Sequence, residues 1–140
     1  MASTVRVDLR AALVVLLDAY VAANPTQLAR TFTTRPPSAI TDRPYAFVDL
    51  GPEEASYDNS IRTRKYAPGF VVVDDLSSNP EAVTRMDLIV DGLVDTLTAN
   101  PHLIAGSSWS NQTVTEVTEA DGTYSVRVAI ADFEKPEGRN

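Results

Sequence analysis

Two stretches of the chain place apolar residues three and four positions apart, the spacing of an α-helix that buries one face. The first runs from about Thr4 to Asn24, where Pro25 disfavours further helix, and the second runs from about Asn79 to Ala99. The first stretch is apolar on more than one side, which indicates more than one packing partner. The expected core stripes are Leu9, Leu13, Leu16, Leu17 and Tyr20 in the first helix, and Val83, Met86, Val90, Leu93, Val94 and Leu97 in the second.

Short apolar or alternating runs between turn signals predict the strands. Asp121-Gly122 predicts a tight hairpin turn between the last two of them. The expected strands are Leu28 to Thr34, Tyr45 to Leu50, Gly69 to Leu76, Gln112 to Glu119 and Thr123 to Asp132. This order predicts an α+β fold, in which a four- to five-stranded, mostly antiparallel sheet carries two packed helices. We expect one domain over residues 1–133 and a flexible C-terminal tail over residues 134–140.

The two central strands are separated by eighteen residues, Gly51 to Pro68, which are mostly polar or charged. Structureless loops of more than about 12–15 residues are uncommon in compact domains unless they are functional or disordered. Arg62, Arg64 and Lys65 form a basic cluster in this segment, and Tyr66 follows it. We interpret the segment as a long loop that binds a partner, and a flexible solvated loop is the alternative.

A second charge pattern lies on the second predicted helix. Asp87, Asp91 and Asp95 recur every four residues, so they share one helix face, where like charges repel by about 0.2–0.5 kcal/mol per pair. A solvated helix face explains such an acidic stripe without any partner. Our hypothesis is that the stripe receives the basic cluster of a neighbouring subunit.

Composition narrows the possible chemistry. The chain has a formal net charge of -7, no cysteine and one histidine. The acidic surface argues against tight wrapping of nucleic-acid phosphate, and the lack of cysteine excludes thiolate chemistry. The apolar run from Ala11 to Leu17 is far too short to span a membrane, so we expect no membrane partner.

Two sets of polar residues invite a catalytic interpretation. Asp49, Asp74 and Asp75 lie at predicted strand ends, where carboxylates can hold Mg²⁺ for a hydrolase, although solvated strand ends or turn caps also explain them. His102 lies near three serines, but no nucleophile-elbow motif accompanies it. We therefore expect no catalytic, metal or cofactor site, and keep the Mg²⁺-dependent hydrolase as the alternative of another class. The serines are Ser107, Ser108 and Ser110.

The elements occur in a distinctive order along the chain. An N-terminal helix is followed by Tyr45-Ala-Phe-Val-Asp-Leu, a long segment with Ile61-Arg-Thr-Arg-Lys, Phe70-Val-Val-Val-Asp, the helix from Glu81 to Leu97 and a closing β-hairpin. Over about Val5 to Phe133, this layout resembles the tail terminator proteins of long-tailed (siphovirus-type) bacteriophages.

The resemblance implies a structural function without catalysis or cofactors. It implies a homohexameric ring in the virion, made in the host cytoplasm, that caps the head-proximal end of the tail tube and stops tube polymerisation. The partners are then the chain itself, the tail tube protein and head-completion proteins, while genome DNA passes through the lumen without specific binding. The resemblance also implies that Arg62, Arg64, Lys65 and Tyr66 are assembly contacts. Another head–tail joining or tail-completion protein is the alternative within this class.

Overall fold

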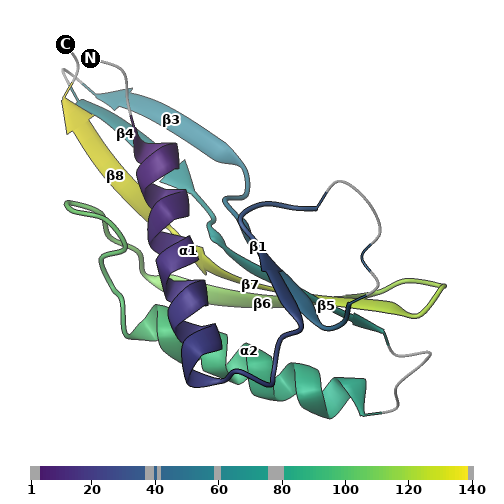
Figure 1. Cartoon of the computed structure of the whole chain (residues 1–140). Helices are drawn as coiled ribbons and strands as arrows, with labels where there is room; N and C mark the ends of the chain where they lie inside the picture. Colours follow the sequence, from purple (N-terminus) through teal and green to yellow (C-terminus); the bar gives the residue numbers. More distant parts are fainter. Residues whose placement is uncertain (1–3, 37–39, 41, 59–60, 76–80, 139–140) are drawn as a thin grey trace.

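The computed structural model describes residues 4–36, 40, 42–58, 61–75 and 81–138. These residues form two helices and eight strands, which Figure 1 shows. They are α1 (Val5–Ala23), β1 (Arg30–Phe32), β2 (Tyr45–Asp49), β3 (Glu53–Asp58), β4 (Ile61–Tyr66), β5 (Gly69–Asp75), α2 (Ala82–Thr98), β6 (Asn111–Thr118), β7 (Thr123–Ala131) and β8 (Phe133–Gly138).

The larger sheet has five strands in the order β1-β2-β5-β7-β6. All neighbouring strands are antiparallel except β1 and β2, which run parallel. This arrangement confirms the predicted α+β class with two helices and a mostly antiparallel five-stranded sheet. Residues predicted to form the hairpin between the last two strands do so, because Gly122 adopts the positive φ of 92° that the turn requires.

Both helices cover one face of this sheet and close the main core with it (Figure 1). Gly92 of α2 lets the helices approach closely, since a Cβ there would lie 2.4 Å from the ring of Tyr20. The predicted stripes are largely buried, but Val83 is exposed and Ile89 takes a buried position instead. The opposite face of the sheet carries a smaller apolar cluster of Phe32, Tyr45, Phe47, Val71 and Val73.

The predicted long loop over Gly51 to Pro68 is wrong for most of its length. Strands β3 and β4 form an antiparallel hairpin there, from the pair of Glu53 with Tyr66 to the pair of Asp58 with Ile61. The tail predicted from Glu134 is likewise a strand, β8, as far as Gly138. It pairs with β4 and completes a three-stranded sheet in the order β3-β4-β8.

The chain passes between the two sheets three times. One crossing leads from β2 to β3, and the other two, from β4 to β5 and from β7 to β8, lie at adjacent points. At one point β4 leads into β5 through Ala67 and Pro68, and Gly69 packs so closely on β7 that a Cβ would lie 2.0 Å from the carbonyl oxygen of Val128. At the other point β7 leads into β8 through Asp132, whose φ of 61° is left-handed. Tyr66 and Phe133 pair at this junction and are both buried in the main core.

Candidate functional site

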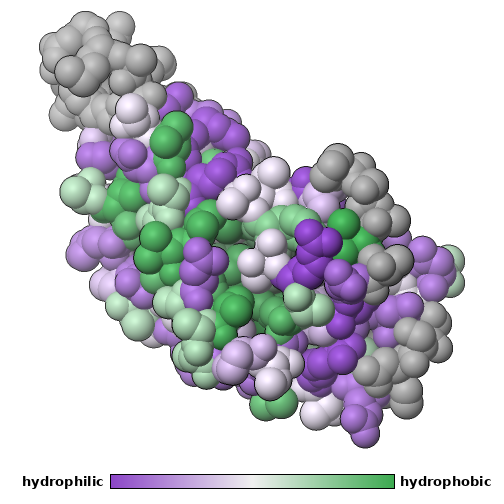
Figure 2. Space-filling view, in the orientation of Figure 1, coloured by the Kyte–Doolittle hydropathy of each residue, from purple (hydrophilic) through white to green (hydrophobic). Residues whose placement is uncertain are grey.

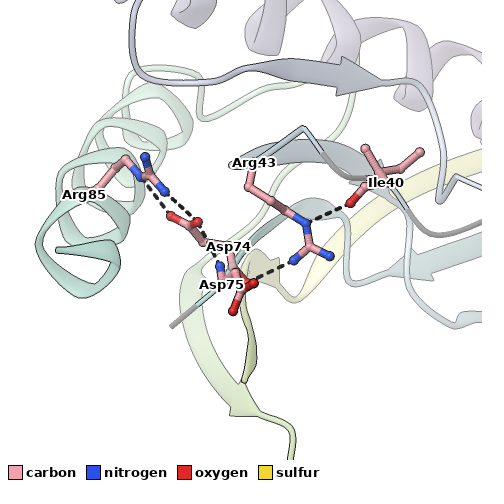
Figure 3. Close-up of polar contacts among 5 residues, drawn as sticks. All are labelled: Ile40, Arg43, Asp74, Asp75 and Arg85. Carbon is pink, nitrogen blue, oxygen red and sulfur yellow. Dashed lines mark hydrogen bonds and ion pairs between the residues drawn. The ribbon is translucent and has the colours of Figure 1, made fainter. Parts of the chain in front are cut away.

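Asp74, a candidate metal ligand, is instead the acidic partner of a buried ion pair (Figure 3). The guanidinium of Arg85 on α2 donates from Nε and Nη2 to its two carboxylate oxygens, at 2.9 and 2.7 Å. The backbone N–H of Asp75 donates a further bond of 2.8 Å to Oδ1. Arg43 also reaches this strand end, donating to the backbone carbonyl of Asp74 at 3.2 Å. The carboxylate therefore holds α2 against the end of β5.

Asp49, the third candidate ligand, lies at the other end of the sheet. Asp49 is opposite Gly69 on β5, and Gly69 comes five residues before Asp74. The two aspartates are therefore about 17 Å apart along the sheet. Asp49 accepts a bond of 2.8 Å from Nε of Arg127. Burial opposes ionisation of Asp49, but hydrogen bonds from Arg127 and Gly51 and the charges of Arg127 and Arg35 outweigh it and lower its pKa.

The described residues therefore do not bring Asp49, Asp74 and Asp75 together as a metal site. Within the ranges given above, no group of three or more His, Asp or Glu residues could hold a metal ion. No helix in those ranges is both long enough and apolar enough to cross a membrane.

His102 and the nearby serines close the segment after α2. Nδ1 of His102 lies 2.7 Å from the backbone carbonyl oxygen of Ser107, not from its hydroxyl. That hydroxyl donates to the carbonyl of Ile104 at 2.7 Å and accepts from its N–H at 3.2 Å. The hydroxyl of Ser110 donates to Asp132 at the sheet junction. These contacts fix a loop and do not align a nucleophile with a base.

The predicted basic cluster lies on β4, where its described side chains are engaged within the chain. Arg64 pairs with Glu53 on β3 at 2.8 Å, and Lys65 pairs with Glu134 on β8 at 3.2 Å. The predicted contact Tyr66 is buried and donates its hydroxyl to Glu53 at 3.0 Å, and burial followed by this bond raises its pKa to about 12. Tyr66 is thus a core residue, and the pairings of Arg64 and Lys65 stabilise the small sheet.

The remaining residue of the cluster, Arg62, lies on β4 opposite Glu137 of β8. Its side chain is outside the part of the structure that is described. By contrast, the acidic stripe lies on one exposed face of the second helix, as the sequence predicted. Asp87, Asp91 and Asp95 are all exposed on the side of α2 that faces away from the core.

A basic pocket that the sequence did not suggest lies between α1 and the β1–β2 connection. It is a cavity of about 100 Å³, and we call Arg6, Arg10 and Arg35 in its lining the arginine pocket. Arg10 donates to the carbonyl of Thr33 at 2.8 Å, and the guanidinium of Arg35 stacks 4.9 Å from the centre of the Phe47 ring. The residues come from segments about 25 positions apart, so their spacing along the chain gave no signal.

Charge in the arginine pocket is only partly compensated. Arg6 pairs at 3.7 Å with Glu53, which also binds Arg64, and Asp49 on the pocket wall is bound by Arg127. Neither Arg10 nor Arg35 forms an ion pair with a carboxylate among the described residues. The pocket is therefore a site of positive charge on a strongly acidic chain, suited to an anionic group.

Comparison with known proteins identifies no matching family model and no significantly similar curated protein. The function must therefore be inferred from the residues and the fold.

Proposed function

We propose that the chain is a phage tail terminator, a structural subunit that forms a ring at the head-proximal end of the tail tube. The layout of its sequence resembles this family, and the fold supplies features that suit an assembly subunit. The observation that carries the proposal is the sheet of β3, β4 and β8, which extends from the body as an arm (Figure 1).

The arm is anchored in the hydrophobic core at its base. Tyr66 and Phe133 are buried at the base, whereas the far end of β4, at Ile61, lies five residues or about 17 Å away. Small sheets need an apolar face packed on another element to be stable in water. An extended three-stranded arm of this kind is typical of a subunit that is covered by a neighbour.

A second feature that favours assembly is the free edge of the large sheet. Strand β6 is an eight-residue edge of the large sheet, and Val114 and Val117 on it are each about half exposed. Edge strands offer unpaired N–H and C=O groups to another chain. The arm extends beyond the large sheet, whereas the β6 edge runs along it (Figure 1), so the two are different surfaces, as a head-to-tail contact requires.

A tube-elongation assay tests the proposal. Tail tube protein of the phage that encodes the chain is polymerised with increasing amounts of the chain, and tube length is followed by light scattering. A tail terminator shortens the tubes at ratios far below one subunit per tube subunit, because one ring stops each tube. The matched control is the chain lacking residues 134–140, which disrupts the arm. Tubes that elongate at the same rate with or without the intact chain would contradict the proposal.

The same assay distinguishes a tail terminator from another head–tail joining or tail-completion protein. A head–tail joining protein that is not a terminator binds finished tubes but leaves elongation unchanged. The expected ring mass is about 91 kDa for six copies of the 15.2 kDa chain, measured by sedimentation of the complexes.

A further inference from the structure

Two helix faces of this chain are complementary to each other but cannot meet within one subunit. The first is on α1, where the arginine pocket borders an exposed apolar ridge. Val7 and Val15 on this ridge are 70% and 65% exposed, and Figure 2 shows hydrophobic surface over α1. The second is on α2, where Leu88, 59% exposed, lies beside the acidic stripe.

The charges on the two helix faces have the same spacing. Arg6 and Arg10 are four residues apart on α1, and successive aspartates of the acidic stripe are four residues apart on α2. Four residues correspond to about 6 Å along a helix, so the two rows of charges can pair at successive turns. The cavity of about 100 Å³ has room for the end of a carboxylate side chain.

The apolar parts of the two faces match as well. Singly exposed apolar side chains are ordinary on a protein surface, but here Val7 lies beside Arg6 and Arg10 on α1, and Leu88 lies beside the acidic stripe on α2. Burial of Val7 and Val15 against Leu88 supplies the non-directional attraction, and the charges fix the register. The two faces belong to different helices, so the contact between copies is heterologous and can close into a ring.

We propose that the arginine pocket and the ridge on α1 receive the acidic stripe of α2 from a second copy of this chain. This inference rests on the proposed ring in that it supplies one of its subunit contacts. It replaces the basic cluster of β4 as the partner of the stripe, because Arg64 and Lys65 are engaged with Glu53 and Glu134 of their own chain.

Mixing of charge-reversed variants tests the contact. In Arg10→Glu, a negative charge in the pocket meets the unchanged acidic stripe. In Asp91→Arg, a positive charge on the stripe meets the unchanged arginine pocket. Each variant alone should therefore self-associate at least about tenfold more weakly than the wild type. Mixed in equal amounts, the two variants can alternate, since every contact then pairs opposite charges. We expect the mixture to recover the wild-type mass by sedimentation.

The controls separate this contact from general charge and folding effects. Glu119→Arg reverses an exposed charge in the β6–β7 turn and should leave self-association unchanged. Thermal unfolding of each variant shows whether Arg10→Glu, which loses the bond to Thr33, still folds. If it does not fold, Asp91→Arg mixed with Arg6→Glu repeats the test without that bond.

A second measurement uses the cysteine-free chain. Ala11→Cys on the ridge and Leu88→Cys beside the stripe should form a mixed disulfide on mild oxidation, and Ala11→Cys with Ala120→Cys in the β6–β7 turn should not. Failure of both the mixture and the cross-link overturns the inference, as does a wild-type chain that stays monomeric at about 1 mM. Loss of phosphate binding in Arg10→Glu with unchanged self-association also overturns it, because the pocket then serves a free anion.

The outcomes also distinguish the two proposals. Wild-type tube arrest without recovery in the mixture leaves the terminator proposal standing and removes this contact. Recovery in the mixture without tube arrest establishes the contact and removes the terminator proposal.

Discussion

Replacing Arg85 by alanine should destabilise the protein more than any change to an exposed ion pair. The side chain of Asp74 is 1% exposed and that of Arg85 33%, and two short bonds join them. Among the described residues, the buried carboxylate without Arg85 would keep the hydrogen bond from the backbone N–H of Asp75 alone. Breaking a buried pair costs about 3–5 kcal/mol, and the partial exposure of Arg85 favours the lower end, about 3 kcal/mol. For 140 residues this lowers the melting temperature by about 10 °C.

Urea unfolding followed by the fluorescence of Trp109, the one tryptophan, measures the effect. The matched control is Arg30→Ala, because Arg30 and Asp42 are 3.8 Å apart and half exposed, and such a pair contributes less than about 1 kcal/mol. Combining Asp74→Leu with Arg85→Leu should recover much of the loss, since no charge is then left buried. If Arg85→Ala costs no more than Arg30→Ala, the assignment of Asp74 as a structural anchor is refuted.

Three further predictions concern the junction between the sheets and the arm. Gly69→Ala should cost about 3 kcal/mol or more, because its Cβ would lie 2.0 Å from a backbone oxygen of β7, and urea unfolding that matches the wild type contradicts this close approach. The raised pKa of Tyr66 means that its contribution to stability is complete below pH 10 and is lost as the pH rises through about 12. Unfolding free energies should therefore fall over this range less steeply in Tyr66→Phe than in the wild type, and equal slopes would contradict the assignment. Ending the chain after Phe133 should expose the amides of β4 to faster hydrogen exchange while those of β2 stay protected. Ending it after Asp132 should lower the free energy of unfolding by about 3–5 kcal/mol more, because Phe133 is fully buried. Unchanged exchange in β4 would show that β8 does not protect it.

Periodicity predicted the elements that the main core contains. The stripes on both helices and the run in β5 are long and apolar, so burial decides their structure and the sequence shows it. The prediction that Val83 belongs to the core stripe was wrong, because α2 turns the side of Ile89 toward the sheet. Both positions lie within reach of an apolar stripe. The predicted start of the second helix, at about Asn79, lies outside the described residues, and α2 begins at Ala82.

The arm was missed because its strands lack the apolar alternation that identifies a half-buried sheet. Its pairing depends on charge instead, as Lys65 opposite Glu134 shows. Strand interiors disfavour proline, but an edge strand such as β8 tolerates Pro136. The opposite charges in Gly51 to Pro68 were a signal for cross-strand pairing, which we interpreted as a feature of a loop. Interpreting them as paired would have predicted the hairpin.

The site was predictable only in part. The acidic stripe follows from a four-residue spacing on one helix, which the sequence displays directly. The arginine pocket depends on how α1 packs beside the β1–β2 connection, which no local pattern encodes. The separation of Asp49 from Asp74 follows from the antiparallel register of β2 and β5, which places residues of similar sequence context at opposite ends.

Electron microscopy of tail tubes incubated with the tagged chain tests the central claim most directly. The account predicts a single ring of the chain at one end of each tube, the end that joins the head, and no label along the tube wall. Label distributed along the walls, at both ends equally, or nowhere on the tubes would contradict it.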